Sequence, residues 1–105
     1  MSPKDKRDKL AARGWNVGDA TEFLNLTPEE EALVELRLKL AEGLKDRRIR
    51  KRLTQVELAK AVNSSQSRVA KMEAGDPTVS LDLLVRSLIA LGASNRDLAK
   101  IIAPR

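Results

Sequence analysis

The chain has 105 residues, which is enough for one compact domain with a modest core and excludes a large multidomain enzyme. It contains no cysteine, which excludes disulfides and thiolate metal sites, and no histidine, the side chain most used for acid–base catalysis near neutral pH. No apolar run reaches the length of a signal peptide or a membrane span, so we expect a cytoplasmic protein that is not an enzyme and needs neither cofactor nor metal.

The formal net charge of +5 is concentrated in the middle third of the chain. Residues 1–36 carry five Lys or Arg against eight Asp or Glu (net −3), residues 37–71 carry eleven against three (net +8), and residues 72–105 carry four of each. Such a local excess is typical of a surface that binds phosphates. A solvated basic helix face gives the same pattern, so the charge alone does not distinguish a phosphate-binding surface from an ordinary helix surface.

Residues 1–26 read as an extension ahead of a domain that spans residues 27–105. Residues 1–13 are charged and, apart from Met1, hold one large apolar residue, Leu10, which predicts a frayed or disordered lead-in. The next thirteen residues hold both aromatic side chains, Trp15 and Phe23. Two interpretations stay open: these rings dock on the long helix of their own chain or a dimer mate, or they bind a partner protein.

A long helix is predicted from Pro28 to about Arg52. Thr27 and Glu30 form a capping box around Pro28, which suits the first helical position. Apolar residues then recur at helical spacing and predict one broad buried face. Its members are Leu33, Leu36, Leu40 and Leu44, widened by Val34, Leu38 and Ala41.

Two short helices follow. Thr54 and Glu57 form a second capping box, which opens a helix over Gln55–Val62. The residues expected to face inward are Val56, Leu58, Ala59 and Val62. Residues 63–65 form a turn, in which Asn63 can adopt the left-handed conformation. The next helix is predicted over Gln66–Ala74 and ends at Gly75.

Two further helices complete the domain. Ser80 caps a helix that runs through Leu91 and is stopped by Gly92. Ser94 and Asp97 begin a short terminal helix that carries Leu98, Ile101 and Ile102. The chain therefore predicts five or six helices and no strand, an all-α fold.

Two short helices joined by a three-residue turn match the helix-turn-helix arrangement. The residues in and around it are Leu53-Thr54-Gln55-Val56-Glu57-Leu58-Ala59, Ser64 through Gly75, Val79-Ser80-Leu81 and Leu88-Ile89-Ala90-Leu91-Gly92. Over roughly residues 40–92 this string resembles the Cro/C1-type (XRE) family of regulators. The resemblance implies a compact five-helix, lambda-repressor-like domain, here with a long first helix, that binds double-stranded DNA as a homodimer on a palindromic operator.

The resemblance also implies roles for individual residues. Gln66, Ser67 and Lys71 fall where family members reach base edges, and Gln55 falls where a side chain touches a phosphate and braces Gln66. Arg48 and Glu73 match a pair inside the family domain. Two departures concern glycine positions of the family, which Arg52 and Asn63 occupy here, and Arg47 stands where many members have a core leucine.

A helical wheel tests the orientation of the predicted helix 66–74 independently. At 100° per residue, one arc of about 140° holds only small or hydrogen-bonding side chains, with Val69 and Met72 opposite. The residues on this arc are Gln66, Ser67, Ala70, Lys71 and Ala74. We expect Gln66, Ser67, Ala70 and Lys71 to read bases and Arg68, at the edge of the arc, to contact a phosphate.

The densest basic cluster lies just before the motif. Its members Arg47, Arg50, Lys51 and Arg52 are expected to bind phosphates together with Gln55 and Arg68, whereas Arg48 is expected to pair with Glu73 first. Cations at a helix C-terminus also suit the helix dipole, which explains part of the enrichment without DNA.

Three functions fit this domain. The first is a sequence-specific transcriptional regulator that acts as a repressor. The second is the antitoxin of a toxin–antitoxin pair, similar to HigA-type antitoxins, with a toxin as partner. The third is an interaction adaptor without DNA binding, against which the +8 central segment argues.

Overall fold

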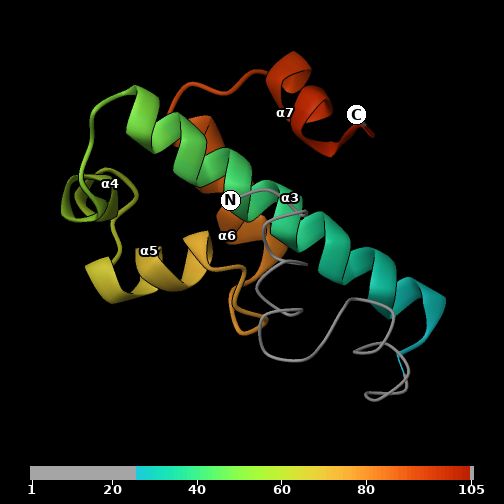
Figure 1. Cartoon of the computed structure of the whole chain (residues 1–105). Helices are drawn as coiled ribbons and strands as arrows, with labels where there is room; N and C mark the ends of the chain where they lie inside the picture. The colour runs from blue at the N-terminus through green and yellow to red at the C-terminus, as the bar shows by residue number, and fades with distance from the viewer. Residues whose placement is uncertain (1–25, 105) are drawn as a thin grey trace.

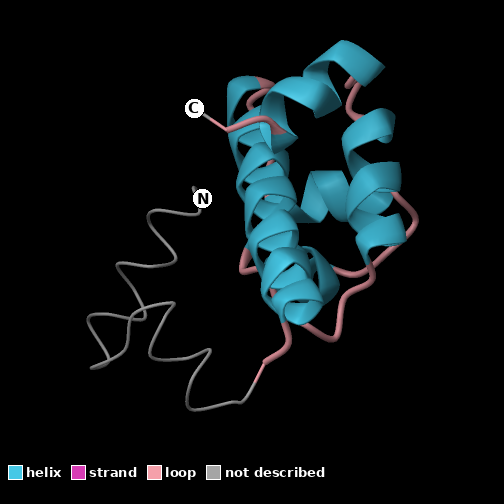
Figure 2. Cartoon of the chain, turned by 90° about the vertical axis from the view of Figure 1, so that its right-hand side faces the viewer, coloured by secondary structure: helices cyan, strands magenta, loops and turns pink. Residues whose placement is uncertain are grey.

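The computed structural model describes residues 26–104 and forms five α-helices with no strand in that range (Figures 1 and 2). They are α3 (Pro28–Arg50), α4 (Gln55–Ala61), α5 (Gln66–Glu73), α6 (Leu81–Ala90) and α7 (Asn95–Ile102). The predicted all-α class is therefore confirmed. The predictions for the extension before Leu26, including Trp15 and Phe23, lie outside the described residues.

The long helix α3 organises the domain. It packs on α5, α6 and α7, while α4 packs on α5, so that α4 and α5 lie to one side of α3 and α7 lies across its C-terminal half (Figure 1). The core between these helices is apolar. Its fully buried large side chains are Leu40, Leu44, Leu58, Val69, Met72, Leu84 and Leu88.

Three apolar residues that were expected to face inward are exposed instead. Leu33 and Val34 are 48% and 38% exposed because they lie near the start of α3, before its first buried residue, Leu38. Val56 is 48% exposed because it lies in the first turn of α4, whose buried residues are Leu58 and Ala59. Val56 therefore lies outside the buried face of α4, whereas Leu33 and Val34 continue the stripe of α3 beyond its first buried residue.

Four helices end in the same hydrogen-bond pattern, in which a residue with positive φ follows the last helical turn. Two of these residues are glycines, Gly75 (φ 71°) and Gly92 (φ 88°). The other two are Arg52 (φ 57°) and Asn63 (φ 55°), the positions where the sequence departs from the family glycines. This pattern ends α3 at Arg50 and the two short helices one residue earlier than predicted.

The terminal helix α7 is held against α3 at both ends. Arg47 pairs with Asp97 at 3.2 Å near the start of α7, and Lys39 Nζ donates to the carbonyl of Ile102 at 3.0 Å at its end. Between them, Ile101 lies so close to Gly43 that an added Cβ would sit 2.7 Å from Ile101 Cδ1. The missing side chain of Gly43 therefore allows the close approach of the two helices.

Candidate nucleic-acid interface

Helix α5 has two chemically distinct faces. Val69 and Met72 are fully buried, and Glu73 is 4% exposed, so this side packs on the domain. The opposite side holds Gln66, Ser67 and Lys71, which are exposed, and Ala70, which is partly buried. The helix therefore presents a short polar surface with a small residue in the middle, through which its backbone can approach a ligand closely.

A chain of hydrogen bonds connects α3 to the first residue of α5. Arg48 and Glu73 form a bidentate pair, with Nε to Oε2 at 2.5 Å and Nη2 to Oε1 at 3.0 Å. Gln55 Nε2 donates to Glu73 Oε1 at 3.2 Å and accepts, through Oε1, a hydrogen bond of 2.8 Å from Gln66 Nε2. Gln55 of α4 thus holds the Gln66 side chain, and Gln55 is itself bonded to the pair that joins α3 to α5.

The Arg48–Glu73 pair is the most buried ion pair among the described residues, with side-chain exposures of 13% and 4%. Arg48 Nη1 also donates to the carbonyl of Leu53 at 2.7 Å, in the turn before α4. A buried charge is stable only when it is paired and hydrogen-bonded, and both conditions are met here. The pair therefore ties the end of α3 to both short helices.

The turn between the short helices is closed by local hydrogen bonds. Asn63 allows the chain to reverse, and the Ser64 N–H donates back to the carbonyl of Ala59 at 2.8 Å. Ser65 then caps α5, where its hydroxyl accepts from the Arg68 N–H at 3.2 Å and shares a hydrogen bond of 3.2 Å with the Ser67 hydroxyl. The start of α5 is thus set by side chains adjacent in sequence.

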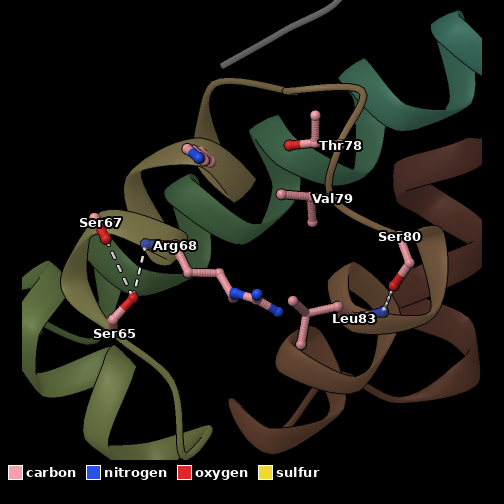
Figure 3. Close-up of a pocket in the computed structure, with 8 residues that line it drawn as sticks. Ser65, Ser67, Arg68, Thr78, Val79, Ser80 and Leu83 are labelled. Carbon is pink, nitrogen blue, oxygen red and sulfur yellow. Dashed lines mark hydrogen bonds between the residues drawn. The ribbon is translucent and has the colours of Figure 1, made fainter.

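A polar hollow of about 380 Å³ lies between α5, the loop after it and the start of α6 (Figure 3). Its lining residues are Ser65, Ser67, Arg68, Lys71, Thr78, Val79, Ser80 and Leu83. Figure 3 shows the Arg68 side chain extending across the hollow toward Leu83. With two cations and several hydroxyl groups, the hollow suits an anion better than an apolar ligand.

The loop that forms one wall of the hollow is held by two contacts. Asp76 Oδ1 accepts from the Thr78 hydroxyl at 2.6 Å and from the Thr78 N–H at 2.8 Å, and these bonds lower the pKa of Asp76. Arg37 of α3 donates to the carbonyl of Val79. The role of Arg37 was not predicted, because its acceptor is a backbone carbonyl 42 residues away, which no side-chain pattern reports.

The cations of the basic cluster at the end of α3 have different surroundings. Arg50 and Arg52 are exposed. Arg47 has a side chain only 16% exposed and pairs with Asp97, and its Nε is buried without a hydrogen-bond partner. Lys51 is exposed, and its Nζ lies beside Gly92, at the turn that ends α6. The structure therefore does not bring all four cations together on the surface of α5.

Clusters of metal-ligating side chains and membrane-spanning helices are both absent from the described residues. No group of three or more acidic side chains there is placed to hold a metal ion. No helix of residues 26–104 is long and apolar enough to cross a membrane.

Comparison with protein families identifies the motif directly. The model of the helix-turn-helix domain family matches residues 39–100, which include the second half of α3, both short helices, α6 and most of α7. No curated protein and no solved structure matches the chain.

Proposed function

The chain belongs to the helix-turn-helix domain family, and from this premise we propose that it is a sequence-specific transcriptional regulator that reads the DNA major groove with α5. The proposal depends on one observation, that α5 has a buried side and an exposed polar side. Its buried side fixes the helix to the domain, while its polar side is exposed and begins with Gln66, which donates a hydrogen bond to Gln55 of α4. A rigid, exposed polar helix face is what base reading requires.

Gln66 keeps the groups it needs to read adenine. Its Nε2 uses one N–H for Gln55, so the second N–H can donate to adenine N7 while Oε1 accepts from N6. The bond to Gln55 fixes the amide before DNA arrives, which reduces the ordering cost of binding. Gln66 is therefore our first candidate for a base-specific contact.

Other residues on the same face complete the proposed reading surface. Lys71 can donate to guanine O6 or N7, and Ser67 can contact either kind of base. The small side chain of Ala70 allows the backbone of α5 to approach the groove floor. We propose these three residues, with Gln66, as the base-reading set.

Phosphate contacts are proposed for residues at the margin of α5. Arg68 lies over the polar hollow, and Gln55, at the start of α4, lies next to Gln66. Arg50 and Arg52 are exposed cations that can bind the DNA backbone. We assign Arg47 and Lys51 no phosphate contact, because Arg47 is paired with Asp97 and Lys51 lies beside the end of α6.

We propose that the protein acts as a homodimer on a palindromic operator, as the family resemblance implies. Each protomer would then place α5 in one of two major-groove segments about one helical turn, roughly 34 Å, apart. Repression of a promoter that contains such a site is the simplest outcome of this binding.

An antitoxin that represses its own operon would bind DNA in the same way and would also bind a toxin. A neighbouring reading frame for a small ribonuclease-like toxin would favour this alternative. DNA binding by α5 is common to both proposals and is therefore tested first.

The test compares Gln66→Ala with Arg50→Ala on two duplexes, an operator selected with the parent protein and a scrambled sequence. Gln66→Ala should lose about 1–3 kcal/mol on the operator and little on the scrambled duplex. Arg50→Ala should weaken both by a similar factor, because a phosphate contact carries no sequence information.

Both variants must melt like the parent before their affinities are compared, since unfolding mimics lost binding. If Gln66→Ala weakens both duplexes equally, α5 does not read bases through Gln66. If the parent protein shows no salt-dependent DNA binding at all, the adaptor function replaces the regulator.

A further inference from the structure

The start of α3 carries an apolar surface that no described helix covers, and we propose that residues 14–24 of the same chain dock on it. This surface, the α3 apolar end, consists of Leu33 and Val34, which are 48% and 38% exposed, with the partly buried Leu26 and Leu36 at its edges. It continues the stripe that packs into the core further along the helix. The proposal concerns a contact outside the DNA-reading surface and goes beyond the proposed function.

The length of α3 explains why this surface is left uncovered. At 1.5 Å per residue, its 23 residues extend about 34 Å, whereas the ten residues of α6 extend about 15 Å. Figure 1 shows the first turns of α3 extending beyond the other helices. Arg37, which reaches the Val79 carbonyl, lies near the limit of the described packing, and Leu38 is the first buried residue of the helix.

The segment directly before α3 has the composition needed to cover such a surface. Residues 14–24 hold the two aromatic residues of the chain together with Val17 and Leu24. Three residues, 25–27, separate this segment from α3 and can span about 10 Å. Leu33 lies six residues beyond Thr27, a rise of about 9 Å, so a chain that reverses at this point brings Phe23 and Leu24 within reach of it.

The small size of the α3 apolar end favours a segment of the same chain over a second protein. A stable interface between two proteins buries roughly 800 Å² on each partner, and two half-exposed side chains supply only a small part of this area. A tethered segment loses no translational freedom on docking and is present at millimolar effective concentration. The apolar area is therefore sufficient for the tethered segment and insufficient for an independent partner.

The charges on both sides are also complementary. Residues 26–36 carry four glutamates, Glu29, Glu30, Glu31 and Glu35, and no cation. Residues 1–13 carry five Lys or Arg against two Asp, a net charge of +3. When residues 14–24 lie along α3, this basic stretch follows them to the same acidic half of the helix, where opposite charges attract.

The single tryptophan of the chain allows a direct test with the full-length protein. The fluorescence emission of Trp15 should be blue-shifted relative to free N-acetyltryptophanamide and protected from acrylamide quenching. In the double variant Leu33→Gln/Val34→Gln, emission should shift to that of the free indole and protection should be lost. Glutamine keeps the helix propensity of α3 close to that of the parent.

The matched control is Ile49→Gln, on the same helix and 53% exposed, which should leave the Trp15 emission unchanged. Parent emission equal to that of free indole, or an unchanged emission in the double variant, overturns the proposal. A blue shift that disappears on dilution assigns the contact to a second copy and also overturns it. Operator affinity should be the same in the double variant and the parent, so failure of this proposal leaves the proposed DNA-binding function unaffected.

Discussion

At the scale of single residues, Arg48 and Glu73 form the most buried ion pair among the described residues. Their bidentate contact joins α3 to the end of α5, and Glu73 also accepts from Gln55, the residue that holds Gln66. The interior therefore contains one polar network in which each charged group has a partner. Loss of Glu73 leaves Arg48 Nε and Nη2 and Gln55 Nε2 without their carboxylate acceptor.

Glu73→Ala should lower the free energy of unfolding by about 3–5 kcal/mol, because it strands the buried Arg48 guanidinium. The matched control is Asp82→Ala, which breaks the exposed Arg86–Asp82 pair at 3.8 Å and should cost less than about 1 kcal/mol. Urea denaturation of both variants measures the difference. Equal losses for the two pairs would show that burial of Glu73 adds nothing to its pairing energy.

Two residues hold a backbone conformation that glycine adopts more easily. Arg52 and Asn63 have φ values of 57° and 55°, at the ends of α3 and α4. In L-residues this conformation brings Cβ close to the following carbonyl oxygen, and Asn tolerates it better than Arg. The strain at Arg52 is therefore the larger of the two.

Arg52→Gly should raise the free energy of unfolding by about 1 kcal/mol, since relief of the left-handed strain exceeds the entropy that glycine adds to the unfolded chain. Asn63→Gly should raise it by less. Chemical denaturation under identical conditions compares the two. A destabilised Arg52→Gly variant would mean that contacts of the Arg52 side chain outweigh its backbone strain.

At the scale of helices, each start is defined by a capping side chain next to it in sequence. Three of the five described helices have a complete capping box, formed by Thr27 with Glu30, Thr54 with Glu57, and Ser94 with Asp97. The N–H of Thr54 donates to Glu57 and that of Ser94 to Asp97, both at 2.9 Å, and these bonds lower the pKa of each carboxyl group.

This arrangement predicts how stability depends on pH. A carboxyl group with a lowered pKa in the folded state stabilises the fold above its unfolded pKa, and this contribution is lost as the pH falls through the folded pKa. Because the ordinary pKa is 4.5 for Glu57 and 3.8 for Asp97, the melting temperature should begin to fall near pH 4.5 and continue to fall below pH 3.8.

The variant Glu57→Gln tests the source of this loss, because glutamine also completes a capping box but does not titrate. Its melting temperature should fall less steeply below pH 4.5 than that of the parent and should be close to the parent value at pH 7. The same steepness in both proteins would assign the acid sensitivity to other carboxyl groups.

At the scale of the whole molecule, several cations of the basic middle third are used inside the domain. Arg37 holds the loop after α5, Arg47 and Lys39 hold α7, and Arg48 pairs with Glu73. The net charge of +8 over residues 37–71 therefore overstates the number of cations available to DNA. The proposed phosphate contacts keep three charged residues in each protomer, Arg50, Arg52 and Arg68.

DNA affinity should fall with salt at about 0.9 units of log K per log salt for each neutralised phosphate, which gives a slope of roughly −3 per protomer. Arg50→Ala should reduce the slope by about one unit. Arg47→Ala should leave the slope unchanged and lower thermal stability, because it removes the contact to Asp97. Titrations of one duplex at several salt concentrations measure the slope for the parent and both variants. A reduced slope in Arg47→Ala would return Arg47 to the DNA surface.

The sequence by itself predicts the elements of this domain well. Capping residues, positive-φ positions and apolar spacing lie next to one another along the chain, so the all-α class and the five described helices follow from them within one or two residues at each end. The same local periodicity separates the polar from the buried side of α5. The resemblance to a known family also paired Arg48 with Glu73, which spacing alone does not do.

Only the tertiary structure decides which of the predicted residues are buried or paired, because this depends on what packs opposite each helix. Leu33 and Leu44 belong to one stripe, yet α3 extends beyond its neighbours at the first and is fully covered at the second. Arg47 and Arg50 belong to one basic cluster, yet Arg47 pairs with Asp97 of α7, whereas Arg50 is exposed to solvent. The hydrogen bond from Arg37 to the carbonyl of Val79 joins residues that are 42 positions apart. Because every residue has a backbone carbonyl, no sequence pattern distinguishes this acceptor.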